Sequence, residues 1–277
     1  MALITLYPHG MTAGTPATVN NHKRAKRTEC KGWSLSSTRG NTKFLRSVVE
    51  TSLTGHGYAI TLTLKHCPPT HSDWMKLRER FFKRISRLGA IRVHWLTEWQ
   101  RRGVPHLHAA VWFDTPVHPH KIYDAWLSCA SEYEPSTRAQ TVKPITDSVG
   151  WFKYLAKHAV RGAGHYQRSS ENIPQGWIKT GRMWGNTGDW DIAEPCRIEL
   201  DSDGYHAFRR IIRSWRKSQA RQDFTKGRAK RIKYARTLLT CHEKNLSSVR
   251  GLSEWINSDT QELILTHLAA SGYLVTS

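Results

Sequence analysis

The chain has 277 residues, enough for one domain of about 150 to 200 residues with appended segments. It contains 42 Lys and Arg against 22 Asp and Glu, a formal net charge of +20. No apolar run approaches the roughly 18 residues that cross a bilayer, and we expect neither a membrane span nor a secretory signal. The five cysteines form no C-x-x-C pair. This argues against a disulfide framework or a zinc ribbon and predicts a cytoplasmic protein.

The positive charge favours a polyanionic partner, because each phosphate contact releases counterions and adds affinity. We favour nucleic acid over an acidic membrane surface. The 12 tryptophans agree with this choice, since aromatic rings among Arg and Lys side chains can stack on unpaired bases.

Residues 1 to about 45 are rich in Thr, Asn, Gly and Ser and include the basic run at 22–27, so we expect a flexible lead-in. Hydrophobic periodicity and turn residues then predict a series of ordered elements. In chain order these are a helix near 44–53, a strand at 58–64, a helix from about 74 that Gly89 ends, strands at 91–99 and 106–113, a helix at about 118–131, a strand at about 140–145, a helix at 149–160 and a hairpin at 176–190.

The composition changes near residue 201. Residues 209–236 carry twelve Lys or Arg and one acidic residue, Asp223, and a last helix runs to Gly272. We therefore divide the chain into a flexible basic segment (1–45), a central domain (46–200) and a basic, mainly helical region (201–277). No phosphate-binding G-x-x-x-x-G-K-[ST] loop is present, so the chain encodes no ATP-driven motor.

His106 and His108 flank Leu107 in a predicted strand, so both imidazoles point to one face of the sheet. With 15 His in the chain, chance alone gives roughly one H-x-H triplet. A second triplet, at 118–120, is interpreted as that chance case. Glu98 precedes the first triplet on the neighbouring strand of the same hairpin. Its carboxylate can therefore reach a metal ion held by both imidazoles, and Mg²⁺ and Mn²⁺ both suit such ligands.

Tyr154, Lys157 and His158 share one face of the predicted helix at 149–160. A tyrosine beside an ammonium group can attack a phosphodiester, because the cation favours the phenolate and offsets charge on the phosphate. An isolated Y-x-x-K is more often a packed core tyrosine.

The order of these motifs resembles the HUH endonucleases: a T-L-T strand (61–63), an H-L-H strand preceded by Glu, and a helix with Y-x-x-K. It resembles in particular the replication initiator (Rep) proteins of rolling-circle plasmids and single-stranded DNA phages. The phrases VGWFKYLAKH and TGRMWG resemble initiators of filamentous bacteriophages.

The resemblance implies an α+β fold with a central antiparallel sheet of about five strands, flanking helices and the H-L-H pair on the middle strand. It implies that Glu98, His106 and His108 bind Mg²⁺ or Mn²⁺, and that Tyr154 is the nucleophile assisted by Lys157. The larger initiators have a second tyrosine on this helix, where this chain has His158. For the second transfer, Tyr166 and a second protomer are both open.

The function implied is site-specific nicking of single-stranded origin DNA, which leaves a 5′-phosphotyrosine and a free 3′-hydroxyl, and later rejoining. A host helicase and polymerase are expected partners, in the bacterial cytoplasm if a phage encodes the chain, and the oligomeric state is open. We expect DNA contacts from one tryptophan and six basic residues: Arg182, Trp184, Arg209, Arg210, Arg213, Arg216 and Lys217.

Two alternatives stay open. A single-strand transposase of the HUH type usually has glutamine after the tyrosine, so Lys157 argues against it. A DNA-binding protein without catalysis would keep the charge, bury Tyr154 in the core and need no divalent ion.

Overall fold

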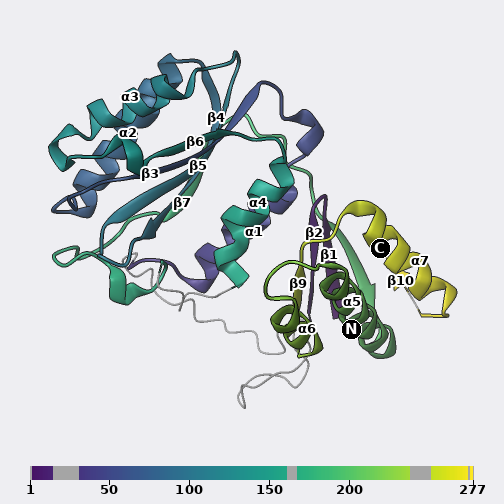
Figure 1. Ribbon diagram of the computed structural model, residues 1–277. Coiled ribbons are helices and arrows are strands. Elements are labelled where there is room, and N and C mark those ends of the chain that lie inside the picture. The colour runs from purple at the N-terminus through teal and green to yellow at the C-terminus, as the bar shows by residue number, and fades with distance from the viewer. Residues whose placement is uncertain (1, 15–30, 161–166, 238–250, 274, 277) are drawn as a thin grey trace, which may run out of the picture. The chain divides into compact units, whose positions relative to one another are not determined.

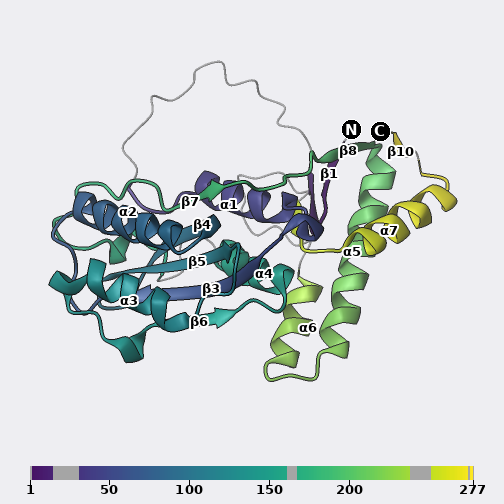
Figure 2. The ribbon, with the colours of Figure 1, turned by 90° about the horizontal axis from the view of Figure 1, so that it is seen from above.

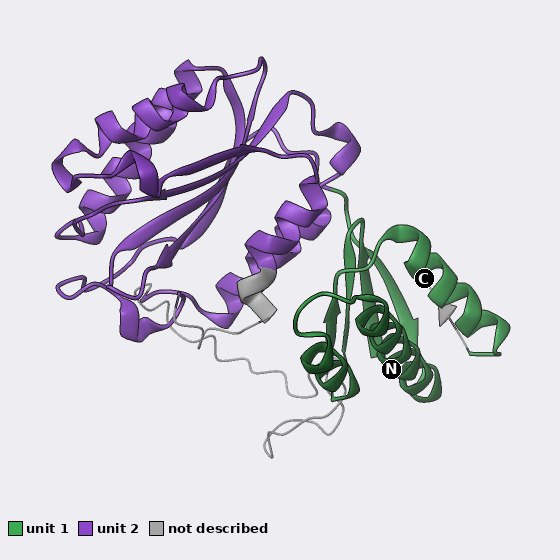
Figure 3. Ribbon diagram, in the orientation of Figure 1, with its two compact units in different colours: residues 1–24, 193–277 green, residues 25–192 purple. Residues whose placement is uncertain are grey.

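The computed structural model describes residues 2–14, 31–160, 167–237, 251–273 and 275–276. Of the helix that carries Tyr154, it describes the side chains up to Ala156. The chain forms two compact units. Unit 1 comprises residues 1–24 and 193–277, and unit 2 comprises residues 25–192 (Figure 3).

Unit 2 is built on an antiparallel sheet of five strands in the order β6-β3-β5-β4-β7, so β5 is central. The strands are β3 (His56–Thr63), β4 (Ala90–Trp99), β5 (Pro105–Phe113), β6 (Thr141–Pro144) and β7 (Trp184–Gly188). The helices are α1 (Leu35–Ser47), α2 (His71–Arg87), α3 (Pro119–Cys129) and α4 (Ser148–Val160), with 3₁₀ turns at Glu50–Ser52, Ser131–Tyr133, Thr137–Ala139 and Ser170–Asn172. The predicted α+β fold with a five-stranded central sheet is confirmed.

Helices cover both faces of this sheet (Figure 1). On one face, α2 and α3 pack through Trp74 and Trp126, whose rings meet edge to face and whose indole N–H groups donate to Thr97 Oγ1 and the Thr63 carbonyl. On the other face lie α1 and α4. Strand side chains alternate between the faces, so His106 and His108 point away from the tryptophan layer.

Local sequence signals set the bounds of α2. Thr70 caps the helix by accepting from the backbone N–H of Asp73, and the Asp73 carboxylate accepts from the N–H of Thr70 in return. The helix therefore begins at His71, slightly earlier than the predicted start near residue 74. At its other end Gly89 has a φ of +93°, and a Cβ there would lie 2.3 Å from the Asp114 carboxylate. Only glycine fits this turn, which explains why Gly89 ends the helix as predicted.

Two predicted elements of unit 2 are wrong. The helix expected near 44–53 is α1, which begins at Leu35 and ends at Ser47. The hairpin expected at 176–190 is one strand, β7, which pairs with β4. The glycine-rich sequence suggested a local turn, whereas the partner strand lies about ninety residues earlier.

Unit 1 contains a second antiparallel sheet, in the order β10-β8-β1-β2-β9. Its strands are β1 (Ala2–Tyr7), β2 (Gly10–Gly14), β8 (Cys196–Leu200), β9 (Leu252–Glu254) and β10 (Val275–Thr276), and its helices are α5 (Ser202–Gln222), α6 (Arg228–Arg236) and α7 (Ser258–Ala270). Figure 2 shows α5 and α6 as neighbouring helices joined by a turn. No helix in the described ranges is long and apolar enough to cross a membrane.

The expected flexible segment 1–45 is wrong for residues 2–14, which form β1 and β2 in the middle of this sheet. It is also wrong for 35–45, which belong to α1. Ile4 lies opposite Ile198 and is fully buried. The region from 201 onward is therefore not an independent helical appendage, because its core includes the first strand of the chain. The basic run at 22–27 lies outside the described residues.

This arrangement makes a stability prediction. Ile4→Ala should lower the free energy of unfolding of unit 1 by roughly 2–5 kcal/mol, because it removes buried methyl groups between two strands. Thr5→Ala, at the next position of β1 and only partly buried, should change it by less than about 1 kcal/mol. Denaturant unfolding followed by circular dichroism measures both. Equal effects of the two variants would show that β1 is not part of the core.

Candidate active site

The register of three strands brings the predicted site residues together. In the β3–β5 pair, Thr61 lies opposite His108. In the β4–β5 pair, Glu98 lies opposite His106. Directly opposed residues share a face of the sheet, so all four side chains project to the face that α1 and α4 cover. The hairpin predicted from the sequence therefore positions the carboxylate beside the imidazoles.

The two imidazoles are in direct contact. His106 Nε2 lies 2.7 Å from His108 Nε2, and the other nitrogen of His108, Nδ1, lies 2.9 Å from Thr61 Oγ1. His108 is buried, whereas His106 is half-buried. The Thr61 hydroxyl fixes the orientation of the His108 ring, the usual role of a second partner of a ligating histidine. The T-L-T motif thus acquires a structural role.

Glu98 is held by a residue that sequence reasoning missed. Arg168 Nε lies 2.9 Å from Glu98 Oε1, and both side chains are fully buried. Arg168 also donates from Nη2 to the Leu155 carbonyl at 3.3 Å, and its guanidinium lies 3.8 Å from the Trp33 ring centroid. Burial lowers the pKa of Arg168, and the Glu98 carboxylate opposes that shift. The ion pair therefore links β4 to the backbone of α4, one residue after Tyr154.

A backbone hydrogen bond explains why Arg168 lies there: the N–H of Trp99 donates to the Gln167 carbonyl at 2.8 Å. No local motif in the sequence marks Arg168. The one signal that could have pointed to it is that a buried carboxylate such as Glu98 needs a cation beside it.

The donor atoms suit a divalent metal. Ligands at about 2.0–2.3 Å in neighbouring positions around an ion are ~3 Å apart. The observed separations are 2.7 Å between the imidazoles and 3.5 Å between His108 Nε2 and Glu98 Oε2. Within the described residues, however, no group of three or more His, Cys, Asp or Glu is already spaced as a metal cluster. The imidazoles touch each other and must separate slightly to share an ion, so the metal site stays a proposal.

Tyr154 lies on α4 beside the histidine pair. Its ring centroid is 5.9 Å from that of His108, edge to face, and the Trp151 ring stacks on it at 4.8 Å. Its exposed fraction is 39%, so a large substrate can reach the ring. Lys157 follows on the same helix, but its side chain lies outside the described residues, as does Tyr166.

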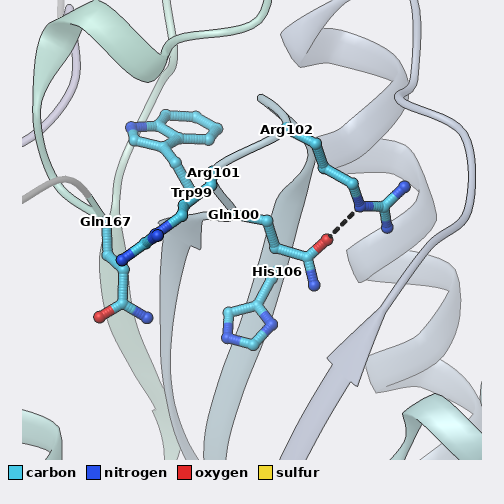
Figure 4. A pocket seen from close by; sticks show the side chains of 6 residues that line it. All are labelled: Trp99, Gln100, Arg101, Arg102, His106 and Gln167. Carbon is cyan, nitrogen blue, oxygen red and sulfur yellow. Dashed lines mark hydrogen bonds between the residues drawn. The ribbon is translucent and has the colours of Figure 1, made fainter.

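A pocket of about 450 Å³ opens next to His106 (Figure 4). The turn after β4 supplies much of its lining. Gln100 donates to Thr63 Oγ1 and accepts from Arg102 Nε, a bond drawn in Figure 4. The full lining is Trp99, Gln100, Arg101, Arg102, His106 and Gln167. Two of the lining residues are arginines, and Arg102 donates to the Leu64 and Lys65 carbonyls. The sequence indicated only a turn here.

The expected DNA contacts separate into two groups. Arg209 is buried, Arg216 pairs with the buried Glu254, and Trp184 packs against both Phe44 and His94. These three side chains contact the rest of the fold, and the burial of Arg209 does not support the prediction that it contacts DNA directly. The remaining four are exposed or half-buried: Arg182, Arg210, Arg213 and Lys217.

Three other histidines, His94, His118 and His120, have structural roles. The second H-x-H triplet caps α3, where His118 accepts from the His120 backbone. His94 shares a face with the pair but is fully buried, bonded to Asn41 and stacked on Phe44. Desolvation lowers its pKa to about 3.

Comparisons with known proteins identify the chain's relatives. Residues 57–159 match the family described as replication-associated protein ORF2/gene II protein. A putative replication protein of Xylella fastidiosa strain 9a5c is 46% identical over the whole of both chains. The replication-associated gene II protein of Pseudomonas phage Pf3 is 45% identical over 99% of each. The chain belongs to this family.

Membership of this replication-associated protein family confirms the expected kinship with phage initiators. Another putative replication protein, from Xylella fastidiosa strain Temecula1, is 45% identical over 92% of this chain and 99% of its own. No solved structure matches the chain significantly. The matched family segment contains Thr61, Glu98, His106, His108 and Tyr154.

The buried ion pair makes a prediction. Arg168→Met should lower the free energy of unfolding of unit 2 by about 3–5 kcal/mol, because it leaves the Glu98 carboxylate buried and uncompensated. Adding Glu98→Gln should restore much of that loss. Arg182→Met, which alters an exposed arginine of the same unit, should change stability by about 0.5 kcal/mol or less. Urea unfolding tests the set, and a double variant no more stable than Arg168→Met would contradict the pairing.

His94 makes a pH prediction. Its folded-state pKa is depressed below the ordinary value of 6.5, so only the unfolded state binds a proton between pH 6.5 and about 3. Stability should therefore fall with decreasing pH, with His94 contributing about 1.4 kcal/mol per pH unit below 6.5. His94→Gln keeps a donor for Asn41 without titrating. The difference in unfolding free energy between wild type and variant should shrink as the pH falls, and a constant difference from pH 7 to 5 would refute this.

Proposed function

We propose that the chain starts replication by nicking single-stranded origin DNA, with Tyr154 as the nucleophile. The observation that carries the proposal is the placement of a 39% exposed tyrosine ring 5.9 Å from the anchored histidine pair. Membership of a replication-associated family supports DNA as the substrate.

His106, His108 and Glu98 Oε2 would hold Mg²⁺ or Mn²⁺. The ion, when bound, supplies a Lewis acid that polarises the scissile phosphate. Thr61 keeps the His108 ring turned so that Nε2 faces this position, and Arg168 restrains the carboxylate through its other oxygen. Arg101 and Arg102 at the pocket mouth offer positive charge to the DNA backbone.

The chemistry proposed is a transfer of the phosphoryl group. Tyr154 Oη attacks the phosphorus, the bond to the 3′ oxygen breaks, and the proton lost by the tyrosine is replaced at that oxygen by one from solvent. The products are a 5′-phosphotyrosine and a free 3′-hydroxyl that a host polymerase can extend. Lys157 would offset the negative charge on the phenolate and phosphate. The energy of the phosphodiester bond is conserved in the phosphotyrosine, so the reverse step rejoins DNA without ATP. A host helicase would separate the strands between the two steps.

Two features bear on the alternatives. A non-catalytic DNA-binding protein would bury Tyr154 in the core, and the observed exposure does not agree with that arrangement. Lys157, where HUH transposases usually have glutamine, argues against a transposase. For the closing transfer we retain two candidate nucleophiles, Tyr166 and the Tyr154 of a second copy.

The test is formation of a covalent adduct. Single-stranded DNA carrying the replicon's origin is incubated with the protein and Mn²⁺ or Mg²⁺ and analysed on a denaturing gel. A protein–DNA adduct should form and should disappear with Tyr154→Phe or with a chelator. His106→Ala and His108→Ala should each reduce the rate roughly 100-fold or more.

Tyr234→Phe is the matched control, because Tyr234 is 50% exposed and lies in unit 1. It should leave adduct formation unchanged. An adduct that persists in Tyr154→Phe, or none with either metal, would overturn the proposal.

A further inference from the structure

The turn between α5 and α6 displays an aromatic side chain to solvent. Phe224 is 82% exposed, although a phenyl ring normally gains free energy by burial. The Arg228 guanidinium lies 4.7 Å from its ring centroid. Of the nine residues of α6, Ala235 alone is buried. This helix and its turn therefore contribute little to the core of unit 1.

The turn is nevertheless rigidly built. Arg231 pairs with the Asp223 carboxylate at 2.9 Å and donates to the carbonyls of Asp223, Thr225 and Lys226. Asp223 also accepts from the backbone N–H and hydroxyl of Thr225, which lowers its pKa. Residues on both sides of Phe224 are thus fixed in position. An exposed ring on a pre-ordered loop loses little conformational entropy when it binds a ligand.

The positive charge around the Phe224 ring favours an anionic ligand. Residues 221–236 contain seven Lys or Arg, and Asp223 is the one acidic residue. Asp223 is already paired with Arg231, so it offers little repulsion to an anion. An aromatic face next to several cations matches an unpaired base flanked by phosphates.

We propose that the α5–α6 turn is a second nucleic-acid-binding site, in which Phe224 stacks on an unpaired base and neighbouring Lys and Arg contact the phosphates. The inference rests on the proposed function only in taking DNA as the partner. It assigns to unit 1 a role in holding single strands, separate from the nicking chemistry of unit 2. Because stacking needs an open base, the site should prefer single strands to duplex.

Binding without cleavage tests this site. The background is the full chain with Tyr154→Phe, in chelator, titrated with a fluorescent single-stranded oligonucleotide and with the matching duplex. Phe224→Ala should weaken single-strand binding about 5- to 150-fold and leave duplex binding nearly unchanged. Phe224→Trp should keep the affinity. The dependence on salt should be unchanged in Phe224→Ala, since no cation is removed.

Two further variants separate stacking from general effects. Leu263→Ala removes another exposed apolar side chain of unit 1, 70% exposed on α7, and should change neither affinity. Arg231→Lys keeps the charge but cannot make the several hydrogen bonds by which Arg231 holds the turn. It should therefore weaken single-strand binding without changing the salt dependence of that binding. Irradiation of oligonucleotides containing 5-iodouracil should crosslink residue 224, identified by mass spectrometry.

The outcomes are distinguishable from failure of the nicking proposal. Unchanged single-strand affinity in Phe224→Ala, or equal weakening on duplex, would overturn the stacking site and leave the adduct test untouched. Binding of the parent to vesicles of anionic phospholipid, lost in Phe224→Ala while DNA affinity stays the same, would assign the turn to a membrane surface instead. Absence of an adduct in the cleavage test would not affect this measurement.

Discussion

Glu98 and Arg168 carry opposite charges into a part of unit 2 that water does not reach, and much of the site depends on their contact. Removing each ion from water costs several kcal/mol, so the pair is stable only with good geometry and further hydrogen bonds. Arg168 finds these at the Leu155 carbonyl and over the Trp33 ring. One guanidinium thereby fixes the carboxylate beside the histidines and the helix that carries Tyr154. The proposed nucleophile and the proposed ligands are placed by the same interaction.

The basic residues of the chain fall into two groups, those that form ion pairs within the fold and those that line the pocket. The net charge alone does not distinguish them. Arg168, Arg216 and Arg231 form ion pairs that hold elements or turns in place. Arg101 and Arg102 line the pocket beside His106. Arg102 is itself held by hydrogen bonds to the Leu64 and Lys65 carbonyls, and any binding of phosphates by this pair should depend steeply on salt.

Some of this could be predicted because the signals were local. The strands from 58 to 113 show clear alternation, so the position of Glu98 on the strand next to the two histidines followed from the sequence. The structure adds the register, with Glu98 opposite His106. The position of Gly89 at the end of α2 followed from the need for a positive φ. By contrast, β1 pairs with β8, about 190 residues later, and β7 pairs with β4. No short window of sequence contains both partners of these pairs, so the first strand was interpreted as a flexible segment.

The sequence by itself determined the H-L-H strand, the tyrosine-bearing helix and the excess of positive charge, since each depends on residue type and short-range spacing. The α+β class followed from the resemblance that the order of these motifs carries. Only the tertiary structure decided which charged groups are buried. It paired Glu98 with Arg168, buried Arg209 and left Phe224 on the surface. The physical reason is that desolvation depends on everything packed around a group, and most of that packing comes from distant segments.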